Sequence, residues 1–150
     1  MENISAHISY KEATISPTAV RLGIKNTPDE MQLKRMKLVA EKCFEPIRAN
    51  YAKPINVTSF FRSALLNKAI GGSSTTSQHM QGEAIDFVCE NMKDLFAWIR
   101  KNVEFDQLIW EYGDDNEPDW IHISYTEQRH NRQQVLRVKR VDGKMVWTVL

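Results

Sequence analysis

The chain has almost no excess of charge of either sign. Its 150 residues include 20 lysines and arginines against 19 aspartates and glutamates, so the formal net charge is +1. Sequence-independent binding to nucleic acid needs a basic surface excess, which this balance does not provide. No apolar run approaches the roughly 18 residues that cross a bilayer. We therefore predict neither a nucleic-acid partner nor a membrane-spanning segment.

Cysteine is also scarce, since the chain has only Cys43 and Cys89. They lie far apart, in apolar surroundings, and belong to no C-x-x-C or zinc-finger spacing. We predict that both are small buried residues. The N-terminal residues lack the charged-then-apolar layout of a secretory signal. We therefore expect a reduced protein made in the cytoplasm without a signal peptide.

Three common catalytic signatures are missing as well. The chain contains no HExxH, no GxxxxGK[ST] and no GxSxG sequence. These absences argue against the commoner zinc proteases, the P-loop nucleotide-binding proteins and the α/β-hydrolases.

What is present is the composition of an ordinary globular protein, with 42% hydrophobic and 26% charged residues. A chain of this length usually forms one domain, and folding can bury roughly 70% of the surface that the unfolded chain exposes. We predict a single domain over residues 1–150 whose core needs no disulfide.

Residues 27–47 have the pattern of an amphipathic helix. Thr27 is a suitable N-cap, Pro28 fits the first helical position, and Glu30 completes a capping box. Apolar residues then recur at helical spacing as far as Ile47. We expect Pro46 to bend or end this helix, because proline cannot donate to the carbonyl four residues before it.

Six short stretches combine β-forming residues with turn signals at their ends, which predicts strands. They are residues 55–60, 84–88, 107–112, 120–125, 135–141 and 145–150. Asp142-Gly143 is a hairpin signal between the last two. Residues 63–70 and a segment capped by Asn91 are expected to be helical, and residues 71–78 a loop. Helices followed by mostly antiparallel strands predict an α+β fold with a central sheet.

The predicted strand over residues 84–88 contains a carboxylate, Asp86, among apolar residues. Desolvating it would cost several kcal/mol unless it is paired, hydrogen-bonded or bound to a metal. Because strand side chains alternate, Asp86 shares its face with the small Ala84. His79 lies in the preceding polar segment, and Gly82 allows a turn that brings His79 toward that face.

A second histidine, His122, lies in the middle of the predicted strand over residues 120–125. Two histidines and one aspartate suit Zn²⁺, and three protein ligands leave a fourth position open, as in catalytic zinc sites. Zinc lowers the pKa of water at that position to about 7. Asp119, at the entrance of the same strand, is a candidate general base outside the ligand set.

These residues form a recognisable pattern. It reads Ser77-x-His79-x-x-Gly82-x-Ala84-x-Asp86, followed by Asp119-x-x-His122. The pattern resembles the zinc peptidases of bacterial cell-wall chemistry, which include D-alanyl-D-alanine carboxypeptidases and phage L-alanyl-D-glutamate endopeptidases. The likeness takes in residues 57–63 and spans about residues 8–125. Within it, the region from Ser16 to Arg48 resembles the phage and prophage branch.

The resemblance implies roles for six residues. It implies zinc ligands at His79, Asp86 and His122, the catalytic base at Asp119, and substrate contacts at Arg62 and Ser77, with Arg62 also stabilising the transition state. It further implies a small α+β domain with zinc in a groove across the sheet. Phe60 departs from the glycine that is usual at its position in the family, which predicts a changed groove beside Arg62.

The function that follows is zinc-dependent hydrolysis of an amide bond in peptidoglycan stem peptides. We expect the stem peptide as partner, a monomer, and action on the cell wall after release or export. One alternative is a non-catalytic, zinc-containing protein of cell-wall binding or phage morphogenesis. Another is a serine hydrolase using Ser77, His79 and Asp86, which is disfavoured because neighbours in one loop seldom form the required hydrogen-bond chain.

Overall fold

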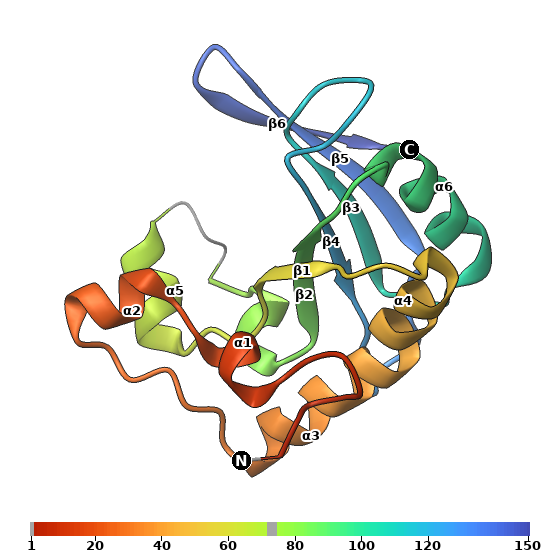
Figure 1. Ribbon diagram of the computed structural model, residues 1–150. Coiled ribbons are helices and arrows are strands. Elements are labelled where there is room, and N and C mark those ends of the chain that lie inside the picture. Colours follow the sequence, from red (N-terminus) through yellow and green to blue (C-terminus); the bar gives the residue numbers. More distant parts are fainter. Residues whose placement is uncertain (1, 72–74) are drawn as a thin grey trace.

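The computed structural model describes residues 2–71 and 75–150 and shows an α+β fold, as predicted (Figure 1). Its helical segments are α1 (Tyr10–Thr14), α2 (Pro17–Leu22), α3 (Glu30–Val39), the π segment η1 (Ala40–Phe44), α4 (Glu45–Tyr51), α5 (Ala64–Ile70), the 3₁₀ turn η2 (Gln78–Gln81) and α6 (Met92–Asn102). Its strands are β1 (Asn56–Ser59), β2 (Ala84–Val88), β3 (Gln107–Glu111), β4 (Trp120–Ser124), β5 (Gln134–Val141) and β6 (Lys144–Val149). The predicted loop over residues 71–78 includes residues 72–74, which lie outside the described residues.

The six strands form one mixed sheet in the order β1-β2-β4-β3-β5-β6. Neighbouring strands are antiparallel except β3 and β5, which are parallel. The last two strands form the predicted hairpin, in which Asp142 and Gly143 both have positive φ, as a type I′ turn requires. Figure 1 shows this hairpin extending beyond the rest of the sheet.

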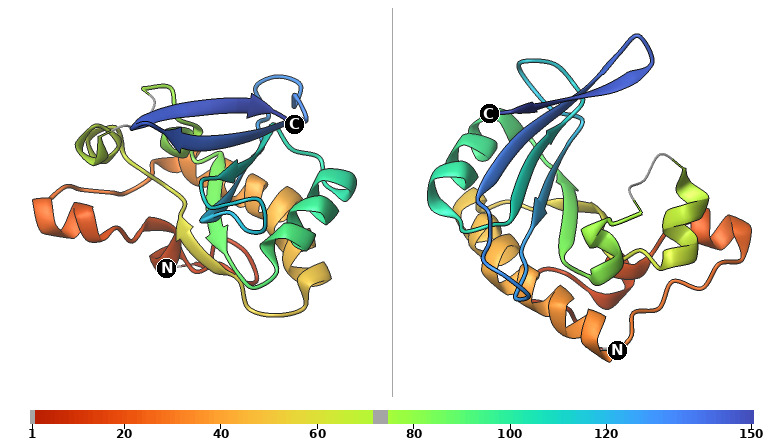
Figure 2. Two further views of the ribbon diagram at one scale, coloured as in Figure 1. Left: turned by 90° about the horizontal axis from the view of Figure 1, so that it is seen from above. Right: turned by 180° about the vertical axis from the view of Figure 1, so that it is seen from behind.

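Alternation along the strands separates a core face from a functional face. Ile85, Phe87, Ile121 and Ile123 are fully buried and pack with residues of α3, α4 and α6. Asp86 therefore points to the opposite face, as predicted. In Figures 1 and 2, α4 and α6 lie on one side of the sheet and α2 and α5 on the other.

The first long helix starts later than the sequence pattern predicts. Asp29, not Thr27, is the N-cap, and its carboxylate accepts a hydrogen bond from the Gln32 backbone N–H at 2.8 Å. The Gln32 side chain returns a hydrogen bond to the Asp29 N–H and also donates to the carbonyl of Met80 at 3.1 Å. Thr27 with Glu30 and Asp29 with Gln32 both have the spacing of a capping box. Only the box at Asp29 also joins the helix to the turn of residues 78–81.

Pro46 does not end this helix, which runs on through α4 to Tyr51. The π segment η1 ends two residues before the proline, and the Glu45 N–H donates to the carbonyl of Ala40, five residues earlier. This wider turn takes up the change in hydrogen bonding that proline imposes, so the chain continues without a break.

Two further predictions need correction. Asn91 does precede α6, but its side chain makes no cap, and its backbone is left-handed with φ 57°. Cys43 is fully buried as predicted, whereas Cys89 is only partly buried. Within the described part of the chain, no helix has both the length and the apolar character needed to cross a bilayer.

Candidate metal centre

Asp86 and His122 are brought together by the pairing of β2 with β4. In this antiparallel register the two residues lie directly opposite each other, and both point away from the core face. His79 reaches them from η2, which comes just before β2. Potential metal-ligating atoms of all three residues lie within 4.8 Å of one another. The fold thus gathers the two histidines and the aspartate that the sequence singled out.

The imidazole of His79 is held in one orientation by the backbone. It is almost fully buried, and its Nδ1 lies 2.7 Å from the carbonyl oxygen of Phe60. That contact makes Nδ1 the protonated nitrogen, so Nε2 keeps its lone pair. Nε2 is buried, has no hydrogen-bond partner among the described residues, and lies 3.2 Å from Oδ2 of Asp86. A buried nitrogen of this kind, with its ring oriented from behind, is what a metal ligand requires.

Asp86 links the two histidines. One of its oxygens lies 2.9 Å from Nδ1 of His122, and the other faces Nε2 of His79. The imidazole rings have their centroids 5.2 Å apart at an angle of 75°. Two imidazole nitrogens and a carboxylate oxygen are a normal ligand set for zinc. The residues present therefore fit a zinc ion.

Burial and mutual attraction act against each other in this cluster. For Asp86, burial raises the pKa, but attraction to His79 and the hydrogen bond with His122 outweigh it and leave the pKa well below the usual range. For His122, burial lowers the pKa, yet the same hydrogen bond and the charge of Asp86 leave it raised. For His79 burial dominates and lowers the pKa, which favours the neutral, metal-binding form.

The turn that carries His79 is closed at both ends. The Ser77 hydroxyl accepts a hydrogen bond from the His79 backbone N–H at 3.2 Å. At the other end Gly82 is left-handed, with φ +76°, and donates to the carbonyl of His79. Between them, Gln78 donates to the buried carboxylate of Asp106 at 3.0 Å. The Ser77 hydroxyl thus bonds to the backbone rather than to the His79 ring, which removes support for the serine-hydrolase alternative.

Arg62 and Glu111 are two charged residues whose electrostatic influence reaches the cluster. The backbone N–H of Arg62 donates to the carbonyl of His79 at 3.2 Å. Burial lowers the pKa of Arg62, while the negative charges of Asp86 and Glu111 oppose that shift. Burial, together with the charge of Asp86, raises the pKa of Glu111. Its carboxylate accepts a hydrogen bond from the indole of Trp120.

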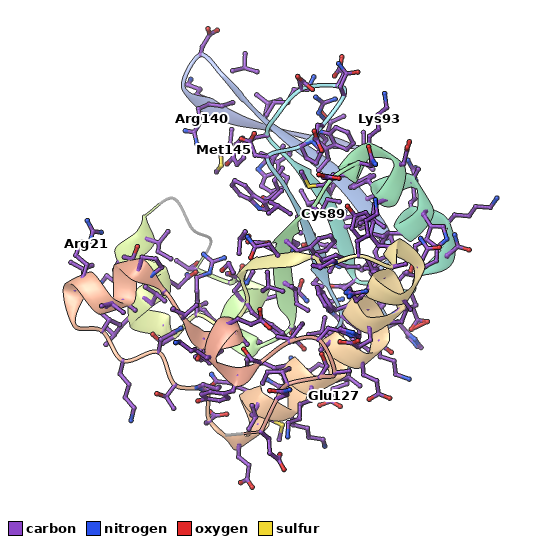
Figure 3. All side chains as sticks on the ribbon, in the orientation of Figure 1. Arg21, Cys89, Lys93, Glu127, Arg140 and Met145 are labelled. Carbon is purple, nitrogen blue, oxygen red and sulfur yellow. The ribbon has the colours of Figure 1, made fainter. Side chains whose placement is uncertain are left out.

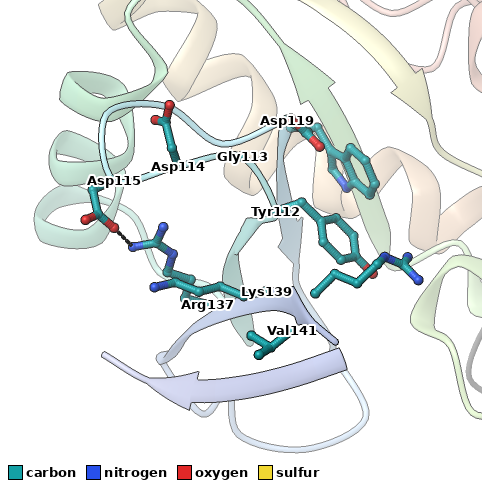
Figure 4. A pocket seen from close by; sticks show the side chains of 10 residues that line it. Tyr112, Gly113, Asp114, Asp115, Asp119, Arg137, Lys139 and Val141 are labelled. Carbon is teal, nitrogen blue, oxygen red and sulfur yellow. Dashed lines mark hydrogen bonds and ion pairs between the residues drawn. The ribbon is translucent and has the colours of Figure 1, made fainter. Parts of the chain in front are cut away.

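Asp119 lies just before β4 and is exposed. Its backbone N–H donates to the carbonyl of Glu111 at 2.8 Å, which fixes the start of the strand. Asp119 and Tyr112 both line an open cleft of about 600 Å³ (Figure 4). Figure 4 also shows Asp115 and Arg137, which both line this cleft, joined in an ion pair.

Some of the supporting contacts could not be read from the sequence. The Phe60 carbonyl that orients His79 has no side-chain signature, and the Phe60 side chain itself is buried in the core rather than exposed beside Arg62. The sequence likewise does not predict the partner of Glu111, whose carboxylate accepts a hydrogen bond from the indole of Trp120.

Comparison with known proteins identifies the family of this chain. None of the curated proteins matches the chain. The family model of peptidase M15 matches residues 6–124, a stretch that contains the whole His79, Asp86 and His122 cluster. Members of this family are zinc-dependent metallopeptidases. Because the match covers most of the chain, and the cluster suits the metal that the family uses, the protein belongs to the peptidase M15 family.

Proposed function

We propose that the protein hydrolyses an amide bond in peptidoglycan stem peptides and belongs to the phage endolysin-like branch of its family. The observation that carries this proposal is the cluster of His79, Asp86 and His122 on one face of the sheet, in a chain of the peptidase M15 family. The match of the motif around these residues to cell-wall peptidases supports the choice of substrate.

His79, Asp86 and His122 would hold the zinc ion. Bound zinc supplies a Lewis acid, which polarises a substrate carbonyl and makes water more acidic. The protein's own contribution is to fix these ligands before any ion arrives. The Phe60 carbonyl sets the tautomer of His79, and Asp86 is already hydrogen-bonded to His122.

Asp119 is proposed as the general base. It stands three residues before His122, just ahead of the strand that carries this histidine, and it lines an open cleft. A carboxylate there can accept the proton of the attacking water and return it to the leaving amine. The backbone hydrogen bond to Glu111 holds the start of the strand, so only the side chain of Asp119 needs to move.

Arg62 and Ser77 are proposed to contact the substrate. The half-buried Arg62, whose charge interacts with that of Asp86, would stabilise negative charge that develops on the carbonyl oxygen. The Ser77 hydroxyl accepts a hydrogen bond from the His79 N–H, which leaves its own proton available for a substrate oxygen.

The test combines metal analysis with digestion of purified peptidoglycan. We expect about one zinc per chain, fragments with newly cut peptide bonds by mass spectrometry, and loss of cutting with a chelator that added zinc reverses. Asp119→Asn should keep its zinc and lose roughly 10²–10⁴ in rate. Asp142→Asn, the same chemical change in the hairpin turn at a residue that does not line the cleft, serves as the control.

Two results would count against the proposal. A zinc-loaded protein that binds cell wall and cuts nothing would favour the non-catalytic alternative. Near-normal cutting by Asp119→Asn would remove Asp119 from the mechanism while leaving the peptidase itself in place.

A further inference from the structure

A row of three side chains leads from the metal centre toward the β5–β6 hairpin. Trp120 lies two residues before His122 on β4, so the two side chains share a face of the sheet. The ring of Tyr112 packs beside that of Trp120, with centroids 5.4 Å apart. The guanidinium of Arg140, on β5, lies over the Tyr112 ring at 5.4 Å from its centroid. We refer to Trp120, Tyr112 and Arg140 as the aromatic row.

The middle of this row is fixed by two separate elements. Tyr112 follows β3 directly in the left-handed conformation, with φ 57°. Its hydroxyl donates to Sδ of Met145 at 3.2 Å, and Met145 pairs with Arg140 across the hairpin. Figure 3 shows Arg140 and Met145 on the side of the hairpin toward α2 and α5. The ring on which the guanidinium rests is therefore positioned by the fold.

Arg140 offers its hydrogen-bond donors to the cleft. A guanidinium that lies over an aromatic ring uses its flat face, while its N–H groups lie in its plane and can bind a carboxylate in bidentate fashion. Arg137 on the same strand is already paired with Asp115 at 2.7 Å. Within residues 2–71 and 75–150, no carboxylate lies within ion-pair distance of Arg140.

All three residues of the row, together with Asp119, line the cleft of about 600 Å³. The cleft therefore joins the proposed general base to an exposed cation through a continuous aromatic wall. Aromatic faces bury the apolar parts of a ligand, and a bidentate arginine adds orientation to them. This is the layout of a peptide-binding surface with an anchor for a negative charge at its far end.

We propose that Arg140 binds a carboxylate of the peptide substrate while the peptide lies along Trp120 and Tyr112. This inference rests on the proposed peptidase function and adds a specificity determinant to it. Arg140 belongs to the hairpin beyond residue 124, where the family match ends. The subsite is therefore formed in part by C-terminal strands that lie outside the family match.

The register of the sheet sets the distance at which this anchor acts. His122 is opposite Ile109 on β3, which is opposite Leu136 on β5, and Arg140 is four residues further along. Two strand spacings and four residue spacings place the backbones of His122 and Arg140 roughly 15 Å apart. An extended peptide covers about 3.3 Å per residue, so the recognised carboxylate is about three to five residues from the bond that is cut.

The test measures binding and turnover separately. Its probes are the free stem pentapeptide and derivatives of it in which one carboxylate at a time, internal or C-terminal, is converted to the amide. Calorimetric titration of the zinc-loaded protein gives affinity, and steady-state hydrolysis gives KM and kcat. The variants are Arg140→Gln and Arg140→Lys, with Lys144→Gln as a control that removes the same charge from the same hairpin outside the cleft.

We expect Arg140→Gln to weaken binding of the acidic peptide roughly 10–100-fold, the usual range for losing a charge-assisted hydrogen bond. Arg140→Gln should not change the affinity for the derivative that is amidated at the recognised carboxylate, because that derivative already lacks the contact. The derivative whose affinity does not depend on Arg140 therefore identifies the recognised carboxylate. Arg140→Lys should recover part of the affinity, since the charge returns without the planar fork. Lys144→Gln should behave as the unmodified protein does.

The subsite is refuted if Arg140→Gln weakens every derivative equally, or if the unmodified protein binds acidic and amidated peptides alike. Carboxylate-dependent binding without any hydrolysis would instead refute the peptidase proposal and leave the subsite standing. Hydrolysis that does not depend on Arg140 would refute the subsite and leave the peptidase proposal standing.

Discussion

The turn at Gly82 ties the stability of the fold to the affinity for metal, and Gly82→Ala tests that link. Gly82 has φ +76°, a conformation that costs an L-residue about 1–2 kcal/mol. A Cβ added there would also lie 2.6 Å from the carbonyl oxygen of Gln32 and 2.8 Å from Cγ of Met36. The methionine side chain can move away, but the carbonyl belongs to helix α3 and cannot move without shifting the helix or the turn.

The two penalties can be separated with a matched glycine. Gly143, in the hairpin turn, has the same φ of +76° and nothing within 4 Å of an added Cβ. Gly143→Ala should therefore cost only the conformational term, about 1–2 kcal/mol. Gly82→Ala adds overpacking of about 1–3 kcal/mol, for a total of roughly 2–5 kcal/mol. For a chain of this size these costs correspond to losses in Tm of about 2–8 °C and roughly 4–20 °C.

Thermal and urea unfolding of both variants measure these costs, and titration with zinc measures their effect on the site. Gly82 donates to the carbonyl of His79, and the neighbouring Met80 carbonyl is bound by Gln32, so a displaced turn moves the His79 ring. We expect weaker zinc binding for Gly82→Ala and unchanged binding for Gly143→Ala. Equal stability of the two variants, or unchanged zinc affinity in Gly82→Ala, would refute the reasoning.

The carboxylates of the half-buried Glu111 and the buried Asp106 should respond to pH in opposite directions, as urea unfolding of the metal-free protein across pH can show. Burial raises the pKa of Glu111, so the protonated acid stabilises the fold at low pH, and that contribution is lost as pH rises through the raised pKa. Over that pH range the free energy of unfolding of Glu111→Gln should therefore increase relative to that of the unmodified protein. Burial also raises the pKa of Asp106, but hydrogen bonds from Arg129 and Arg132 outweigh it and lower the pKa. Asp106→Asn should cost about 1–3 kcal/mol at neutral pH, with the gap closing as pH falls. Parallel pH profiles for variant and unmodified protein would contradict either expectation.

The features that sequence predicted well depend on local periodicity. The alternation of Ile85, Asp86 and Phe87 places one polar group on the face opposite the core wherever that strand lies in the sheet. The same holds for His122 between Ile121 and Ile123. Because a strand has only two faces, a buried polar residue among apolar neighbours indicates the functional face before the partner strands are known.

The features that sequence missed depend on contacts between distant segments. Asp29 and Thr27 both satisfy the spacing of a capping box, and the choice between them involves the contact of Gln32 with the later turn at Met80. The orientation of His79 comes from the carbonyl of Phe60, a group that every residue type carries. Neither contact has a signature in the residues themselves, since each requires knowing which segments meet.

Because the chain itself orients the cluster, the metal is not needed to assemble it. Packing on the core face sets the register that places Asp86 opposite His122, while a backbone carbonyl and a capped turn hold His79. Asp86 and His122 already lie within hydrogen-bond distance of each other. A zinc ion bound here would meet ligands that the fold holds in place, so little conformational entropy remains to be lost when the metal binds.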